Sequence, residues 1–177
     1  EKHTTLTATI AISLSFLLIL LIDVYAIIYG SPGQLQVGNW LQSGNYRILL
    51  SFTLDTFGLI MMTLVAFISL LTIRFSVNYL HREAGYQRFF ISLCLFSGAM
   101  LLIVSAGNAA LTFAGWELAG MSSYLLIAYA YDRPASVQNA TRAFITNRIG
   151  DASFLTGIYL AYFWLGDIEW PVIVGNA

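Results

Sequence analysis

Residues 108–130, NAALTFAGWELAGMSSYLLIAYA, are the most informative stretch of this 177-residue chain. The stretch is apolar enough, and long enough as a helix, to cross the ~30 Å hydrocarbon layer of a lipid bilayer. Glu117 interrupts it about 14 Å past Asn108, close to the middle of such a layer, at the helical rise of ~1.5 Å per residue. A carboxylate without a partner at that depth costs free energy on the order of several kcal/mol. Ionisable groups there usually face a protein or water-lined interior and mark ion pathways, so the stretch predicts an ion-translocating membrane protein.

The next apolar stretch carries a second pair of ionisable residues, Arg148 and Asp151 in ITNRIGDASF. Residues three apart project from the same face of a helix and can pair with each other. One interpretation is a structural pair that neutralises itself. The other is that Asp151, or its pairing with Arg148, is a switchable charge in a relay.

Glu117 also has a structural and a functional interpretation. As a structural group it would be a protonated carboxyl hydrogen-bonded to a neighbouring helix. As a functional group it would carry a proton or form an ion pair. We favour the second, because Gly115 and Gly120 on either side allow another helix to approach closely.

The composition agrees with a membrane protein and excludes other classes. The chain is 58% hydrophobic and 10% charged, whereas soluble domains carry about 25% charged residues. A net charge of −1 gives no reason to expect a nucleic-acid partner. Cys94 is the single cysteine, which rules out a disulfide framework. The expected surroundings are therefore the lipid bilayer and other membrane proteins.

Hydrophobic patterning predicts an all-α fold, a polytopic bundle of about five transmembrane helices forming one membrane domain over residues 1–177. The turn between the third and fourth helices, residues 105–108, is very short, so these two helices should be antiparallel neighbours. The five predicted spans are residues 6–28, 56–77, 89–106, 108–130 and 137–165.

Residues 31–52, between the first two predicted spans, differ from the rest of the chain. Glycine and proline punctuation and a Gln-Ser-Gly-Asn turn signal favour a short β-hairpin at the membrane surface, with Trp40 as an interfacial aromatic. An ordered loop without regular structure is the alternative. Asp55, just before the second span, is expected to cap that helix.

The basic residues predict the orientation of the chain in the membrane. If the helices alternate in direction, six of the eight Lys and Arg residues fall on one side and only Arg47 falls on the other. That side should face the cytoplasm or its equivalent. The six residues are Lys2, Arg74, Arg82, Arg88, Arg133 and Arg142.

Four sequence blocks, in this order, resemble the antiporter-like subunits of respiratory complex I. The resemblance is closest to the distal, largest membrane subunit, which is similar in turn to the large subunit of multi-subunit cation/proton antiporters and to the membrane partner of inorganic-carbon uptake complexes. It covers residues 46–162, and the Gly-Trp-Glu and Asn-Arg-Ile-Gly-Asp elements together make it specific. The blocks are FTLDTFGLIM, YLHREAGYQRFFISL, FAGWELAGMSSYLLIAYAY and NRIGDASFL.

This resemblance implies roles for the three ionisable residues. Glu117 would be the buried glutamate of a proton half-channel, normally paired with a lysine on a later broken helix. Asp151 would be the acidic residue that tunes this pair, and Arg148 its basic companion. Lys2 is the only lysine in the chain, so the lysine-bearing helix must come from elsewhere. We expect either a fragment of a longer antiporter-like subunit, which we favour, or a split subunit completed by another chain.

The predicted function is that of a non-catalytic, proton-translocating membrane subunit of a complex I-like NADH:quinone oxidoreductase. It would lie in a bacterial inner membrane or the mitochondrial inner membrane. NADH, FMN, iron–sulfur clusters and quinone are expected in partner subunits, and no cofactor is expected in this chain because clustered Cys and His ligands are missing from its sequence.

Two alternatives of other classes stay open. One is a non-redox proton-coupled transporter subunit, for cation/proton antiport or inorganic-carbon uptake. The other is a structural membrane scaffold in which the buried charges lock helices together. The neighbouring chains of the assembly, and the effect of replacing Glu117, would separate these functions.

Overall fold

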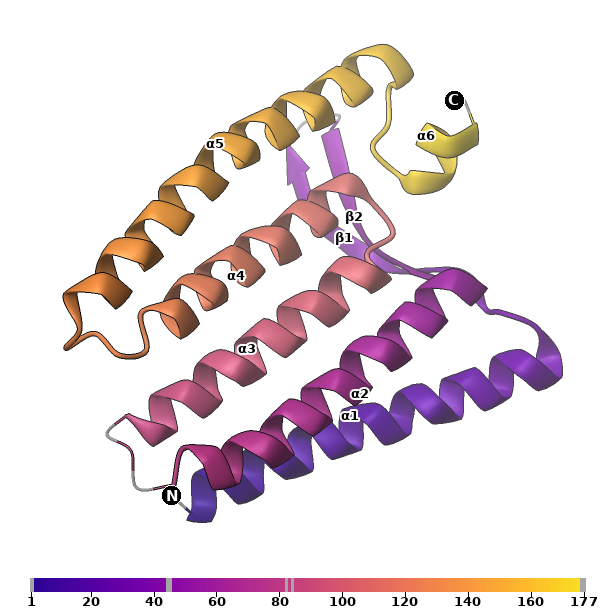
Figure 1. Ribbon diagram of the computed structural model, residues 1–177. Helices are drawn as coiled ribbons and strands as arrows, with labels where there is room; N and C mark the ends of the chain where they lie inside the picture. Colours follow the sequence, from indigo (N-terminus) through magenta and orange to yellow (C-terminus); the bar gives the residue numbers. More distant parts are fainter. Residues whose placement is uncertain (1, 44–45, 82, 84, 176–177) are drawn as a thin grey trace.

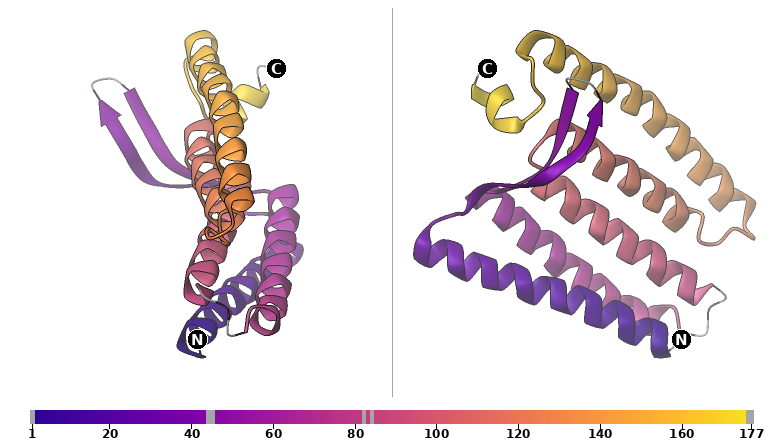
Figure 2. Two further views of the ribbon diagram at one scale, coloured as in Figure 1. Left: turned by 60° about the vertical axis from the view of Figure 1, so that its left-hand side comes forward. Right: turned by 180° about the vertical axis from the view of Figure 1, so that it is seen from behind.

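Five long helices lie side by side in the order of the sequence (Figure 1). The computed structural model describes residues 2–43, 46–81, 83 and 85–175. Each long helix packs mainly against its neighbours along the chain, and seen on edge the helices form an open layer rather than a closed bundle (Figure 2). The predicted helical membrane fold is thus confirmed. The elements are α1 Lys2–Tyr29, β1 Gly33–Ser43, β2 Tyr46–Leu54, α2 Thr56–Tyr79, α3 Tyr86–Ser105, α4 Ala109–Ile127, α5 Pro134–Leu165 and α6 Trp170–Gly175.

Three helices of the described chain, α1, α2 and α3, are each long and apolar enough to cross a bilayer. Helices α4 and α5, the other two predicted spans, do not reach the same apolarity. Glu117 and several Gly and Ser residues lower that of α4, while Arg148 and Asp151 are among the polar residues of α5. With 32 residues, α5 is about 48 Å long at ~1.5 Å per residue, which exceeds the thickness of a hydrocarbon layer.

The helix ends follow local sequence signals. The Oδ1 atom of Asp55 accepts a hydrogen bond from the Gly58 amide at 2.7 Å, which confirms the predicted cap of α2. Pro134 starts α5, where its missing N–H costs nothing. Gly166 ends the same helix with φ of 76°, a left-handed conformation that favours glycine.

The short connection between α3 and α4 makes them antiparallel neighbours, as predicted. Gly115 is the reason they approach closely. A Cβ atom at this position would lie 2.9 Å from Ile103 Cγ1 and 3.1 Å from the Ile103 backbone nitrogen. A larger residue would push the two helices apart.

The segment between α1 and α2 is an antiparallel hairpin that projects away from the helix layer (Figure 2). Its register pairs Gly33 with Leu54 and Gln42 with Arg47, with irregularities between Gln36 and Gly38 and between Asn39 and Leu41. The hairpin prediction is confirmed, and the alternative of an irregular loop is wrong. Two residues of the predicted turn signal, 44 and 45, lie outside the described residues.

The largest buried apolar cluster joins α1, α2 and α3, with Ile73 and Phe90 completely buried at its centre. Elsewhere many large apolar side chains point outward, among them Ile27, Phe57 and Ile149, each 70% exposed or more. Such a surface would aggregate in water but is the expected surface of helices surrounded by lipid.

The two ends of the layer differ in charge. The start of α1, the end of α2, the start of α3 and the α4–α5 connection share one end (Figure 1). Arg74, Arg88, Arg133 and Arg142 belong to these segments, in agreement with the predicted orientation. Arg82 and the side chain of Lys2 lie outside the described part of the chain. The hairpin, with Arg47, and α6 occupy the other end.

Candidate functional site

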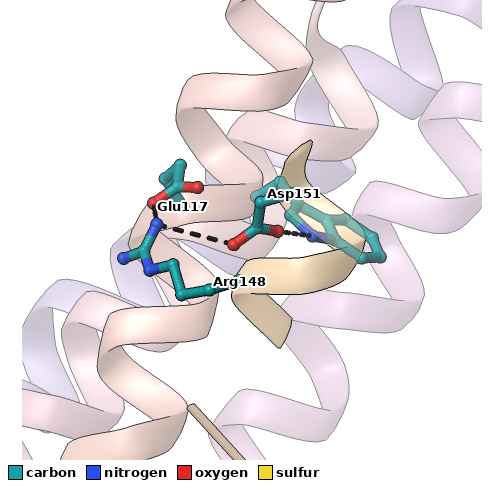
Figure 3. Close-up of polar contacts among 4 residues, drawn as sticks. Glu117, Arg148 and Asp151 are labelled. Atoms are coloured by element: carbon teal, nitrogen blue, oxygen red, sulfur yellow. Dashed lines mark hydrogen bonds and ion pairs between the residues drawn. The ribbon is translucent and has the colours of Figure 1, made fainter. Parts of the chain in front are cut away.

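The candidate site lies between α4 and α5, which run side by side (Figure 3). Glu117 is eight residues beyond the first residue of α4 and ten before its last. Asp151 is similarly central in α5, seventeen residues after Pro134 and fourteen before Leu165. Both carboxylates therefore lie near the middle of their helices, as the sequence predicts.

Arg148 connects the two carboxylates. Its Nη1 atom donates a hydrogen bond to Glu117 Oε2 on the neighbouring helix, in a short contact. The same nitrogen lies 3.5 Å from Asp151 Oδ2 on its own helix. Figure 3 shows the guanidinium group between the two acids. The structure thus brings together all three residues that the sequence singled out.

Trp116 is a fourth member of this network that sequence reasoning missed. Its indole Nε1–H donates a hydrogen bond to Asp151 Oδ1 at 3.2 Å, and its ring contacts Phe154 edge-on at a centroid distance of 6.1 Å. The indole therefore holds the carboxylate oxygen that Arg148 does not contact. Its position directly before Glu117 was a signal, but only the path of α5 shows which group it meets.

The network is buried at one side and open at the other. The side chain of Asp151 is 10% exposed, that of Glu117 26% and that of Arg148 43%. Only Ala140 and Asp151 are buried in α5, since no described helix packs on its outer face. The guanidinium group lies 4.6 Å from the ring centroid of Phe144, which favours a cation at this open side.

The charges of this network do not balance when every member is ionised. Two carboxylates face one guanidinium group, and no other Lys or Arg of the described chain forms an ion pair with either acid. In a medium of low polarity such an excess negative charge is costly. The arrangement can therefore take up a proton, or pair with a further cation, at low cost.

A small cavity separates these side chains. Its volume is about 10 Å³, and Gly120 and Asn147 line it together with the charged residues and Phe144. This space holds at most one water molecule. Gly120 allows α5 to approach here, since a Cβ atom on it would come 4.0 Å from Asn147 Nδ2.

A second polar cluster, which we call the Glu169 clasp, consists of Gln34, Ser51, Asn108 and Glu169. Glu169 Oε2 accepts hydrogen bonds from Gln34 Nε2 at 2.6 Å and Ser51 Oγ at 2.8 Å. Its Oε1 atom accepts one from Asn108 Nδ2 at 3.0 Å. The clasp joins the hairpin, the α3–α4 turn and the segment before α6. In sequence Asn108 gives only a weak polar signal, and Glu169 counts only as a charge on the less basic side.

Asn108 serves the clasp and α4 at the same time. Its Oδ1 atom caps α4 by accepting from the Leu111 amide at 2.8 Å. Its amide group also donates to the Leu49 carbonyl at 2.8 Å. Asn108 and Ser51 are completely buried, and Glu169 is 7% exposed. The clasp is therefore a structural joint at the hairpin end of the layer.

The described residues contain no group of three or more His, Cys, Asp and Glu side chains that could hold a metal ion. The chemistry open to the candidate site is therefore that of its own ionisable groups. These can bind and release protons, and they can exchange ion-pair partners.

Two family models match the chain. The model described as NADH-Ubiquinone oxidoreductase (complex I), chain 5 N-terminus, matches residues 40–90. The model described as NADH:quinone oxidoreductase/Mrp antiporter, TM, matches residues 106–176. The second match contains Glu117, Arg148 and Asp151.

Individual relatives give the same assignment. The chain is 34% identical over 146 residues to NAD(P)H-quinone oxidoreductase chain 5 of Synechocystis sp., which covers 82% of this chain and 21% of the relative. It is also 34% identical over 146 residues to NADH-ubiquinone oxidoreductase chain 5 of Neurospora crassa, covering 82% of this chain and 20% of the relative. The chain therefore spans about one fifth of the length of these relatives.

Two solved structures share the fold. A chain of the membrane-bound sulfane sulfur reductase, an archaeal respiratory membrane complex, superposes with a TM-score of 0.84 at 18% identity, over 98% of this chain and 34% of that chain. A chain of the Mrp complex from Dietzia sp. gives a TM-score of 0.71 at 21% identity, over 95% and 20% respectively.

The central charged network, the helical membrane fold and both family matches lead to one assignment. The chain is an integral, multi-pass membrane protein that belongs to the family of complex I chain 5 and Mrp antiporter-like membrane subunits, and it corresponds to the N-terminal portion of that family.

Proposed function

We propose that this chain supplies part of a proton path in a complex I-like NADH:quinone oxidoreductase, with Glu117, Arg148 and Asp151 as coupled charges. The observation that carries the proposal is the single guanidinium group shared by two carboxylates on two helices, near the middle of both. A purely structural pair needs one acid for one base. The second acid leaves a group that can be protonated without breaking the joint.

In the proposed mechanism the guanidinium group of Arg148 responds to whichever carboxylate is charged. When a proton neutralises Glu117, the attraction between Arg148 and Asp151 is no longer shared and becomes stronger. When the proton leaves, the guanidinium group returns towards Glu117. Coulombic coupling over such distances is much stronger in a protein interior than in water. The hydrogen bond from Trp116 keeps Asp151 in place while the arginine moves.

We expect protons to reach this network from the basic end of the layer, where the α4–α5 connection lies. A further helix carrying a cation, from the same polypeptide or from another chain, would cover the open side of Glu117 and Arg148. Both the uncompensated acid and the exposure of Arg148 support such a partner. In this arrangement the lysine implied by the family resemblance would share Glu117 with Arg148.

The redox chemistry would take place in partner subunits that hold NADH, FMN, iron–sulfur clusters and quinone. This chain would be a non-catalytic subunit of a large membrane complex. The names of the relatives from Synechocystis sp. and Neurospora crassa support the coupling to quinone reduction. A bacterial inner membrane or the mitochondrial inner membrane remains the proposed location.

A second candidate function is cation/proton antiport without redox chemistry. The family model over residues 106–176 names the Mrp antiporter together with NADH:quinone oxidoreductase. The same network would then exchange protons against a metal cation, with the gradient as the driving force. Dependence of proton movement on NADH oxidation separates the two functions.

The test is the Glu117→Gln substitution in the full-length subunit within its complete complex, reconstituted in sealed vesicles. Glutamine keeps the shape and the hydrogen-bonding capacity but cannot carry the proton. We expect the complex to assemble normally while proton translocation, followed with a pH-sensitive dye, falls more than about tenfold, since general acid–base groups contribute about 10²–10⁴-fold. Glu117→Asp should be milder because a carboxyl group remains.

The matched control is Glu83→Gln, the same chemical change at an exposed residue between α2 and α3. It should leave both assembly and proton translocation unchanged. Normal proton translocation by an assembled Glu117→Gln complex would refute the relay and leave the structural scaffold as the explanation of the network.

A further inference from the structure

A groove lies at the basic end of the helix layer, where the start of α1, the end of α2 and the start of α3 meet (Figure 1). Its volume is about 610 Å³. We propose that this groove binds the headgroup of an anionic glycerophospholipid. The polar lining residues are Thr5, Thr9, Arg74, Asn78, His81 and Tyr86.

The charge of the groove favours an anion. No Asp or Glu residue is among the lining residues. Arg74 is exposed, and no ion pair or hydrogen bond joins its guanidinium group to another described residue. Arg88, at the same end, is different, since it donates to the Tyr129 carbonyl at 2.8 Å and stacks on the Tyr131 ring at 4.5 Å. Arg74 is thus available for a ligand phosphate, with His81 beside it.

The depth of Arg74 matches the level of lipid phosphates. It lies five residues before Tyr79, the last residue of α2, which places its Cα about 8 Å below the helix end at ~1.5 Å per residue. A long arginine side chain at this depth extends its charge to the membrane interface. Basic pockets between transmembrane helices on the cytoplasmic side are typical binding sites for anionic headgroups.

An apolar stripe continues from the groove towards the middle of the layer. Leu6 lines the groove, and Ile10 and Leu14 follow at intervals of four residues, which places them on the same face of α1. Their exposed fractions are 57%, 55% and 55%. An acyl chain can lie along this stripe while its phosphate contacts Arg74. Free inorganic phosphate would make no use of the stripe, so the occupant we infer is a lipid.

The wall of the groove is held in place by a hydrogen bond between helices. Thr5 Oγ1 and the hydroxyl group of Tyr86 are 2.5 Å apart and connect α1 to α3. Behind them lie the buried side chains of Ile73 and Phe90. The starts of α1 and α3 point to this end, and their helix dipoles add positive partial charge near the anion. The groove is therefore formed before a ligand binds.

The experiment uses the full-length subunit in its purified, delipidated complex, titrated with phosphatidylglycerol and measured by native mass spectrometry. Because one basic residue near a membrane surface contributes about a fivefold gain in affinity for an acidic lipid, Arg74→Gln should weaken binding about fivefold. Arg74→Lys should recover most of the loss. Phosphatidylcholine should bind weakly and equally to all variants.

The matched control is Arg142→Gln, which removes the same charge from α5 at the same end, where the nearby surface depression is lined by α5 alone. It should not change the binding. The proposal is overturned if Arg142→Gln loses as much binding as Arg74→Gln, or if Arg74→Gln binds phosphatidylglycerol normally. Displacement of the lipid by millimolar inorganic phosphate would show a phosphate site instead. A photo-crosslinker at Thr9 that captures another subunit rather than a lipid would show a protein interface.

Discussion

Two glutamates of this protein are removed from solvent to different degrees and have opposite kinds of partners. Glu169 is 7% exposed and accepts hydrogen bonds from three neutral groups, those of Gln34, Ser51 and Asn108. Glu117 is more open, and its partner is the charged guanidinium group of Arg148. The first carboxylate joins segments far apart in the sequence, while the second shares a cation with Asp151.

The difference shows how partners decide the role of a carboxylate. Three fixed neutral donors favour one ionisation state and one geometry, which suits a structural joint. A cation shared by two acids has two arrangements of similar energy, which suits a switch. The substitutions below test this contrast, beginning with the one expected to have the largest effect on stability.

The Glu→Gln substitution should have opposite consequences at the two sites. At Glu169 all contacts come from donors, so an amide NH₂ would face another N–H group. We expect Glu169→Gln to destabilise the folded subunit by about 3 kcal/mol, because buried donors lose their acceptor. Glu117→Gln should leave stability nearly unchanged, since Arg148 keeps Asp151. Thermal aggregation of the detergent-solubilised complex measures both.

Asn108→Asp serves as the control for this contrast. It keeps the oxygen that caps α4 but replaces the amide donor beside Glu169 with a like charge. It should therefore lower stability at least as much as Glu169→Gln. If both clasp variants are as stable as the natural protein, the clasp is not the joint described above.

The second test concerns the sharing of Arg148. Arg148→Ala leaves both Glu117 and Asp151 without their cation and should reduce stability or assembly by about 2 kcal/mol, a value that allows for the partial exposure of the arginine. Adding Asp151→Asn should recover part of the loss, because fewer uncompensated charges remain. The yield of assembled complex on a native gel is the measurement.

Glu117→Gln in the Arg148→Ala background completes the cycle. Recovery with only one of the two acids neutralised would show that Arg148 serves that acid alone. No recovery with either acid would mean that the arginine pairs with neither in the assembled complex, contrary to the shared arrangement.

The third test removes the indole donor. Trp116→Phe keeps an aromatic ring next to Phe154 but loses the hydrogen bond to Asp151. We expect a stability loss of about 1 kcal/mol, the typical contribution of one hydrogen bond. Proton translocation should fall more than stability suggests, because Asp151 is then free to follow Arg148. Unchanged translocation would remove Trp116 from the relay.

The smallest effect is expected at the outer member of the clasp. Gln34→Ala removes one of the donors to Glu169, but Gln34 itself is exposed on the hairpin and water can take its place. The expected loss is about 0.5 kcal/mol, at the low end for a hydrogen bond. A loss equal to that of Glu169→Gln would mean that the hairpin, rather than Asn108, holds the clasp together.

The sequence alone determined the features that depend on composition and local spacing. Apolar runs of sufficient length indicated the helices, since a bilayer requires them. Asp55 before an apolar run predicted a cap, because a cap needs only its own first turn. The depth of Glu117 followed from the helical rise and identified the residue without a structure.

Only the tertiary structure decided which distant groups meet. Spacing within α5 predicted the pairing of Arg148 with Asp151, but not that the same guanidinium group reaches Glu117, 31 residues earlier. Ser51 and Glu169, 118 residues apart, form a buried hydrogen bond that no local pattern encodes. Such contacts depend on how the helices pack and where the hairpin folds back. The helices are set by short-range hydrogen bonding and hydrophobicity, whereas the partners of the two glutamates are set by the packing of the whole layer.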